Sequence, residues 1–97
     1  MTATDVREAL RAVIDPEIGI NIVDLGLVYG VSVDEARVRV TMTMTSPACP
    51  LAEYLKVDAQ AAVRARVAGV EVVEIAIVWE PPWMPDRMSD EARRQLQ

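Results

Sequence analysis

The spacing of apolar residues along the chain predicts helices and strands in turn. Apolar residues recur every three or four positions over 5–14 and again over 51–67, which is the period of an amphipathic helix. An apolar segment at 27–33, a polar break, and strict alternation of apolar and polar residues over 37–45 together indicate a β-hairpin. The segment 70–79 is apolar at nearly every position, so we expect a third strand there.

Residues typical of helix ends support these assignments. Thr2 or Thr4 can cap the first helix, and Asp15-Pro16 should end it, because proline disfavours helical geometry in the residue before it. Ser89 can cap a short C-terminal helix that follows a proline-rich segment.

The resulting order, α-β-β-α-β-α, predicts an α+β fold, a two-layer α/β sandwich with a three-stranded mixed sheet, in a single domain spanning 1–97. In the second strand of the hairpin, the apolar residues should face the core: Val38, Val40, Met42 and Met44. The residues between them should form a solvent face: Arg37, Arg39, Thr41, Thr43 and Thr45. The third strand is apolar on nearly both faces, so its second face should need a cover, either the C-terminal tail or a second subunit.

Length and charge narrow the classes of function. At 97 residues the chain can bury one modest core. Its net charge of -5 opposes the phosphate contacts that dominate nucleic-acid affinity, so a nucleic-acid role is disfavoured. No apolar run approaches the roughly 20 residues that span a bilayer, and the N-terminus lacks the basic start of a signal peptide. We therefore expect a cytoplasmic protein that does not bind membranes.

The chemistry available is limited to thiol, carboxylate and hydroxyl groups. The chain has no histidine, which removes the commonest general base and a common metal ligand. Its single cysteine, Cys49, stands between the hairpin and the second helix. A helix start stabilises a thiolate, so Cys49 could be nucleophilic or bind a metal ion. The alternative, equally weighted from position alone, is a small buried residue at a turn.

Carboxylates gather around the end of the first helix. Asp15 and Glu17 bracket Pro16, and Asp24 follows in an apolar segment. Such carboxylates can act as acid and base or bind hard metal ions. For an isolated Asp-Pro-Glu, the favoured interpretation is a turn in which Asp15 accepts hydrogen bonds from nearby backbone N–H groups.

Two further pairs of residues have both a structural and a functional interpretation. Thr43 and Thr45 are most simply solvent-facing strand residues, and they gain interest only from their nearness to Cys49. Trp79 and Trp83 flank a pair of prolines; they are more often packing groups, but together they could form a partner surface.

One thiol alone cannot complete the sites that thiolates usually build. Zinc takes four ligands, and an iron-sulfur cluster usually takes four thiolates. A homodimer would contribute two sulfurs and leave the other positions to carboxylates, a small thiol or a client protein. Such a site would be labile and suited to handing metal on.

Several motifs share a fixed order along nearly the whole chain. They are Asp15-Pro16-Glu17, the segment 22–28, Thr41 to Pro50, Trp79 to Trp83, and Met88 to Ala92. In this pattern the sequence resembles the family of metal-sulfur cluster biosynthetic proteins, which includes MIP-type, SufT-like and PaaD-like members. PaaD-like members carry an additional cysteine-rich C-terminal part that this sequence lacks, so it is most similar to a stand-alone SufT-like member.

The resemblance implies an iron-sulfur cluster assembly domain-like fold and a non-catalytic, accessory role in maturing iron-sulfur proteins. It implies that the Asp-Pro-Glu loop and the turn that leads to Cys49 meet in one pocket. The residues carried over to that pocket are Asp15, Glu17, Thr43, Thr45, Ser46 and Cys49. Cys49 would bind iron or an iron-sulfur cluster transiently, with none bound tightly by one chain. We expect a homodimer, across which the site could be shared. The implied partners are the iron-sulfur assembly machinery and apo-client proteins.

Two other functions stay open from the residues alone. A small thiol enzyme would use Cys49 as nucleophile and Asp15 or Glu17 as base, although the absence of histidine removes the usual Cys-His pair. A structural adaptor would instead bind proteins through its open strand face and Trp83.

Overall fold

The computed structural model describes residues 1–45 and 51–96. The predicted helices and strands occur in the predicted order, with two very short strands and a 3-10 helix in addition. The elements are α1 (Ala3–Leu10), β1 (Ile14–Asp15), β2 (Ile20–Asn21), β3 (Val28–Asp34), β4 (Arg37–Met42), α2 (Leu51–Arg66), β5 (Val72–Ile77), η1 (Pro85–Arg87) and α3 (Asp90–Gln95).

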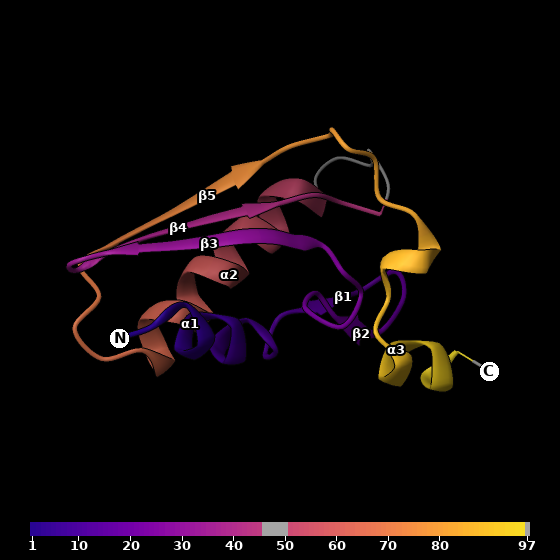
Figure 1. Ribbon diagram of the computed structural model, residues 1–97, viewed down its shortest axis with the longest axis horizontal. Coiled ribbons are helices and arrows are strands. Elements are labelled where there is room, and N and C mark those ends of the chain that lie inside the picture. The colour runs from indigo at the N-terminus through magenta and orange to yellow at the C-terminus, as the bar shows by residue number, and fades with distance from the viewer. Residues whose placement is uncertain (46–50, 97) are drawn as a thin grey trace.

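The main sheet has the strand order β3-β4-β5 and is mixed, as predicted. β3 and β4 form the antiparallel hairpin, whereas β4 and β5 are parallel and are joined through α2. Figure 1 shows α1 and α2 together on one face of this sheet, which gives the expected two layers. The described helices include none with the length and apolar character needed to cross a membrane.

The core lies between the sheet and the two helices. Paired residues of adjacent strands share a face of the sheet, and the inward rows are Val31–Val40–Ile75 and Val33–Val38–Val73. The other face carries mainly polar or small residues, among them Ser32, Arg39, Glu74 and Ala76. The C-terminal tail was one expected cover for this second face, and that expectation was wrong, because the tail packs elsewhere. β5 presents its larger apolar side chains inward, so its outer face is less apolar than the sequence suggested.

The predicted alternation along the second hairpin strand is correct up to Met42 and wrong beyond it. Arg37 and Arg39 are exposed, while Val38, Val40 and Met42 are buried. Thr43, expected on the solvent face, is only 1% exposed, and the next residue, Met44, is also buried. β4 ends at Met42, and the Thr43 N–H then donates to the carbonyl of Leu27 at 2.9 Å. Without the strand pleat, neighbouring side chains no longer point to opposite faces.

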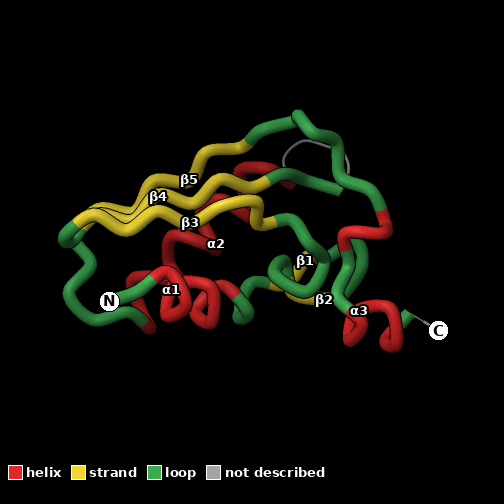
Figure 2. The backbone as a smooth tube through the Cα atoms, viewed as in Figure 1, coloured by secondary structure: helices red, strands yellow, loops and turns green. Residues whose placement is uncertain are grey.

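The first helix is shorter than predicted. Thr2 caps it in a reciprocal arrangement with Asp5, but the helix ends at Leu10 rather than at the Asp-Pro pair. Residues 14–15 instead pair with 20–21 as β1 and β2, a small sheet that Figure 2 shows between α1 and α3. Backbone pairing of β1 therefore replaces the last helical turn that the apolar period suggested. α3 begins as predicted, with the Ser89 side chain accepting from the Ala92 N–H.

Candidate functional site

Asp15 forms the turn that links β1 to β2. Its Oδ1 accepts a hydrogen bond from the Glu17 N–H at 2.9 Å, and its backbone carbonyl accepts from Gly19 N–H at 2.7 Å. This is the turn arrangement that the Asp-Pro-Glu sequence favours. The carboxylate is completely buried. Since an ionised carboxylate without partners is costly to bury, these hydrogen bonds are what allow it to remain there.

The second carboxylate oxygen of Asp15 reaches the end of the hairpin. Thr45 Oγ1 donates to Asp15 Oδ2 at 3.1 Å, a contact between residues 30 positions apart in the sequence. Thr45 precedes Cys49 by four positions. The structure thus brings together two of the residues carried over from the family resemblance, one from each of the two loops.

Thr43 lies two residues before Thr45 and is also buried. Its Oγ1 has no hydrogen-bond partner among the residues that the structure describes. A buried hydroxyl usually has a hydrogen-bond partner, so the Thr43 hydroxyl can still form a hydrogen bond. It lies two residues before Thr45, which contacts Asp15. Glu17 is exposed, and its backbone rather than its carboxylate contacts Asp15. Ser46 and Cys49 lie outside the described residues.

The contacts of Asp24 indicate a structural role rather than a catalytic or metal-binding one. Arg11 Nη1 donates to its Oδ1 at 2.9 Å and Asn21 Nδ2 donates to its Oδ2 at 2.7 Å. Burial alone would raise the pKa of Asp24, but the hydrogen bonds from Asn21 and Arg11 outweigh it and lower the pKa below its ordinary value. Both oxygens take part in hydrogen bonds within the chain, which favours the structural interpretation of Asp24 over a role as base or metal ligand.

Residues 81–89, which we call the C-terminal strap, cross the turn that contains Asp24. Trp83 Nε1 donates to the carbonyl of Leu25 at 2.7 Å, and the Ser89 N–H donates to the carbonyl of Asp24 at 2.7 Å. Tyr29 Oη donates to the carbonyl of Pro81 at 2.8 Å. The sequence did not predict this contact, because the partners are up to 58 positions apart.

The two tryptophans differ in their surroundings. Trp83 is half-buried against the core and its indole N–H is engaged, which is the packing role that the sequence also allowed. Trp79 is 48% exposed. Of the two residues predicted to form a partner surface, Trp79 is therefore the one with a free aromatic surface.

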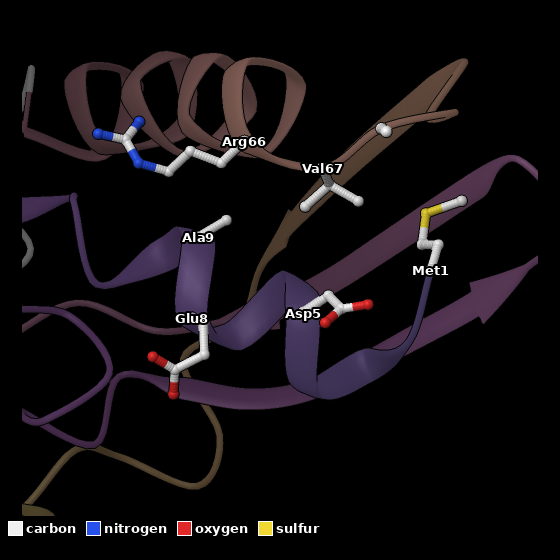
Figure 3. A pocket seen from close by; sticks show the side chains of 7 residues that line it. Met1, Asp5, Glu8, Ala9, Arg66 and Val67 are labelled. Carbon is white, nitrogen blue, oxygen red and sulfur yellow. The ribbon is translucent and has the colours of Figure 1, made fainter.

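A hollow of about 400 Å³ lies between the start of α1 and the end of α2. Figure 3 shows the side chains that line it, including those of Asp5, Glu8 and Arg66. Asp5 is used in the helix cap, and Glu8 pairs with Arg11 at 3.3 Å. None of the predicted site residues lines this hollow. Within 1–45 and 51–96, no three cysteine or carboxylate side chains gather in a way that could hold a metal ion.

Comparisons with known proteins match this chain to iron-sulfur assembly proteins. A family model described as "Iron-sulfur cluster assembly protein" matches residues 3–77. The Fe-S protein maturation auxiliary factor of Porphyromonas gingivalis is 45% identical over 96 residues, covering 98% of this chain and 90% of that protein. The Fe-S protein maturation auxiliary factor SufT of Staphylococcus aureus is 48% identical over 85 residues, covering 87% of this chain and 96% of that protein.

A solved structure has the same fold. The crystal structure of a domain of unknown function from Bacillus anthracis matches with a TM-score of 0.93 at 42% identity, covering 97% of this chain and 90% of that one. The family model includes Asp15, Thr43 and Thr45 but ends before the C-terminal strap.

Proposed function

This chain belongs to the iron-sulfur cluster assembly protein family, and from that premise we propose that it is an accessory factor in the maturation of iron-sulfur proteins. Its role is non-catalytic: it helps to deliver iron or a cluster to client proteins in the cytoplasm. Two relatives that match nearly this whole chain are named as maturation auxiliary factors, which supports the assignment.

Cys49 is the residue that binds the cargo. It is the only thiol in the chain, and thiolates are the ligands that iron-sulfur clusters prefer. In sequence it precedes Leu51, the first residue of α2, by two positions. A helix start favours a nearby thiolate, which supports Cys49 as the metal-binding residue in this proposal.

The observation that carries this site is the hydrogen bond from Thr45 to the buried Asp15 carboxylate. It ties the Asp-Pro-Glu turn to the segment that leads to Cys49. Thr43, whose buried hydroxyl has no hydrogen-bond partner within 1–45 and 51–96, and Ser46 add polar groups on the same segment. We assign Asp15, Thr43, Thr45 and Ser46 to positioning this segment, and Glu17 to contacting a client from the solvent side.

One chain supplies one soft ligand, so the site is completed from outside. The remaining ligands come from a client protein, a small thiol or the Cys49 of a second copy in a homodimer. Incomplete coordination makes the bound cluster labile, as transfer requires. Trp79, exposed beyond β5, contributes to the surface that meets the assembly machinery or a client.

The test is cluster transfer under anaerobic conditions. The purified chain is loaded with iron and sulfide, and transfer to an apo-ferredoxin is followed by visible absorbance. Cys49→Ser should abolish loading and transfer. Asp15→Asn should keep loading but slow transfer about tenfold, because it removes the charged acceptor of Thr45. Asp58→Asn, a carboxylate loss on α2, is the matched control and should transfer normally. Equal transfer by Cys49→Ser and the unmodified chain would refute the proposal.

A further inference from the structure

The sheet ends at β5, and part of the outer edge of this strand is open. Among the described strands β5 pairs with β4 alone, and Figure 1 shows it along the upper margin of the sheet. The Val78 N–H donates to the carbonyl of Met42, on the β4 side, at 2.8 Å. Backbone groups alternate in direction along a strand, so those of Val73, Ile75 and Ile77 face away from β4.

Side chains of α2 cover the first half of this edge. Gln60 Nε2 donates to the carbonyl of Val73 at 3.4 Å, and Arg64 Nη1 donates to the carbonyl of Glu71 at 3.2 Å. α2 therefore runs antiparallel to β5 at this edge. Four helical residues rise about 6 Å and two strand residues about 6.6 Å, so the two elements stay in step.

The second half of the edge has no such cover from the residues that the structure describes. The same helical stripe continues toward the start of α2 with Val57 and Glu53, which this spacing places beside Ile75 and Ile77. Val57 has no side-chain hydrogen-bonding group and is 60% exposed. In the part of the chain that the structure describes, nothing bonds to the outward backbone groups of Ile75 or Ile77.

β5 also lacks the bulge, glycine or proline that often protects an edge strand. β3, at the other edge, has an irregularity between Val28 and Gly30, and such bulges oppose pairing with another strand. β5 is regular over Val72–Ile77 and contains neither glycine nor proline. An open, regular edge of this kind is a template for an additional extended segment.

A second copy of the chain is a poor occupant for this edge. One antiparallel pairing of two copies aligns Ile75 with Ile77 of the second copy and brings no like charges face to face. The other aligns Ile77 with its own copy and Ile75 with Trp79 of the second copy. It also places Glu74 directly opposite Glu80 of the second copy, and like charges in that position are destabilising. The net charge of -5 on each chain opposes both pairings.

We infer that an extended, basic segment of a partner protein pairs with β5 at Ile75–Ile77 and adds a strand to the sheet. Main-chain hydrogen bonds would hold it, and its apolar side chains would cover Val57 and Trp79, which are 60% and 48% exposed. Its lysine or arginine side chains would meet the exposed acidic residues around the edge, Glu53, Glu74 and Glu80. This pairing does not depend on metal binding by Cys49.

The test uses a short peptide of alternating valine and lysine, blocked at both ends, added to the isotope-labelled full chain. We expect the amide exchange of Ile75 and Ile77 to slow about tenfold at saturation, with the largest chemical-shift changes at these residues and Val57. The same peptide with glutamate in place of lysine should bind about tenfold more weakly. Equal binding of the two peptides, or shifts that map away from β5, would overturn the inference.

Charge and backbone variants test whether the open edge itself binds the peptide. Glu74→Lys with Glu80→Lys should abolish the preference for the lysine peptide, whereas Asp34→Lys with Glu35→Lys, the same charge change at the hairpin turn, should retain it. Ile77→Pro removes the outward N–H together with a half-buried side chain and should prevent pairing; circular dichroism of the variant checks that the chain stays folded. If the Ile75 and Ile77 amides become protected with rising protein concentration and no peptide, a second copy occupies the edge and the inference is wrong.

Discussion

Two buried aspartates hold the loops of this small domain in place. Asp15 and Asp24 are both buried, yet each carboxylate oxygen has a hydrogen-bond partner within the chain: Glu17 N–H, Thr45, Arg11 or Asn21. A charge in a low-dielectric setting makes these hydrogen bonds directional and costly to break. The two aspartates therefore fix the ends of the β1-β2 turn and the turn that follows it.

The low pKa of Asp24 predicts a loss of stability in acid. Its pKa lies below the ordinary value of 3.8 when the chain is folded, because the hydrogen bonds from Asn21 and Arg11 outweigh the effect of burial. The unfolded chain therefore binds this proton more readily. The resulting stability is fully present above about pH 4 and is lost as the pH falls through the lower, folded value.

Urea unfolding at a series of pH values measures this contribution. We expect Asp24→Asn to lower the free energy of unfolding by about 1–3 kcal/mol at pH 7 and to differ less from the unmodified chain below pH 3. Glu91→Gln, which removes an exposed ion pair with Arg94, should change the free energy of unfolding much less than Asp24→Asn at every pH, because solvent screens exposed pairs. A difference between Asp24→Asn and the unmodified chain that stays constant from pH 7 to pH 2 would contradict this account.

At the scale of elements, the contact between the C-terminal strap and the turn before β3 depends on Gly26. This residue has a φ of +79°, and a Cβ there would overlap the backbone carbonyl of Arg87. Arg87 in turn lies over the Tyr29 ring, with its guanidinium carbon 4.9 Å from the ring centroid. The turn and the strap can approach closely only because this position has no side chain.

Gly26→Ala and Gly19→Ala form a matched pair. Gly19 has a similar φ of +82°, but a Cβ there would meet nothing within 4 Å. Gly19→Ala should cost about 1 kcal/mol for its backbone conformation, and Gly26→Ala should cost at least about 2 kcal/mol more because the strap must move. Thermal or urea unfolding compares them, and equal costs would show that the strap does not pack on Gly26.

The sequence predicts the helices and strands whose hydrophobic period or capping residue lies within the element itself. α2 and the β3-β4 hairpin follow from periods that their own residues carry, and Ser89 marks the start of α3 by itself. β1 and β2 are two residues each and exist only through their mutual pairing, so no period could reveal them. The prediction that Thr43 faces solvent was wrong because the alternation of apolar and polar residues continues in the sequence after β4 has ended at Met42.

The residues of the candidate site likewise divide into those that a local sequence pattern indicates and those that no local pattern indicates. Asp15 could be found from its Asp-Pro-Glu turn, and its link to Thr45 could be expected only through the family resemblance. Arg11 and Asn21 gave no signal, because nothing in their sequence neighbourhood indicates that they converge on Asp24. The Trp83 contact with Leu25 likewise depends on how the whole chain folds back on itself.

At the scale of the molecule, the C-terminal strap closes the end of the fold at which β1, β2 and the Asp24 turn lie (Figure 1). The strap lies outside the family model, which ends at residue 77, but inside the region matched by the Porphyromonas gingivalis relative and the Bacillus anthracis structure, which cover 98% and 97% of this chain. It nevertheless covers the backbone of Leu25 and satisfies the carbonyl of Asp24. The stability of the Asp15 turn, which pairs with residues just before Asp24, should therefore depend on residues far along the chain.

Shortening the chain tests this dependence. A chain that ends at Trp79 loses the strap and α3, whereas one that ends at Ser89 keeps the strap and loses only α3. The first should lower the free energy of unfolding by at least about 3 kcal/mol more than the second, since it removes the half-buried Trp83 and leaves two turn carbonyls without their donors. Amide exchange at Gly26 and Leu27 should quicken in the shorter chain alone. Identical unfolding of the two chains would mean that the strap rests on the fold without stabilising it.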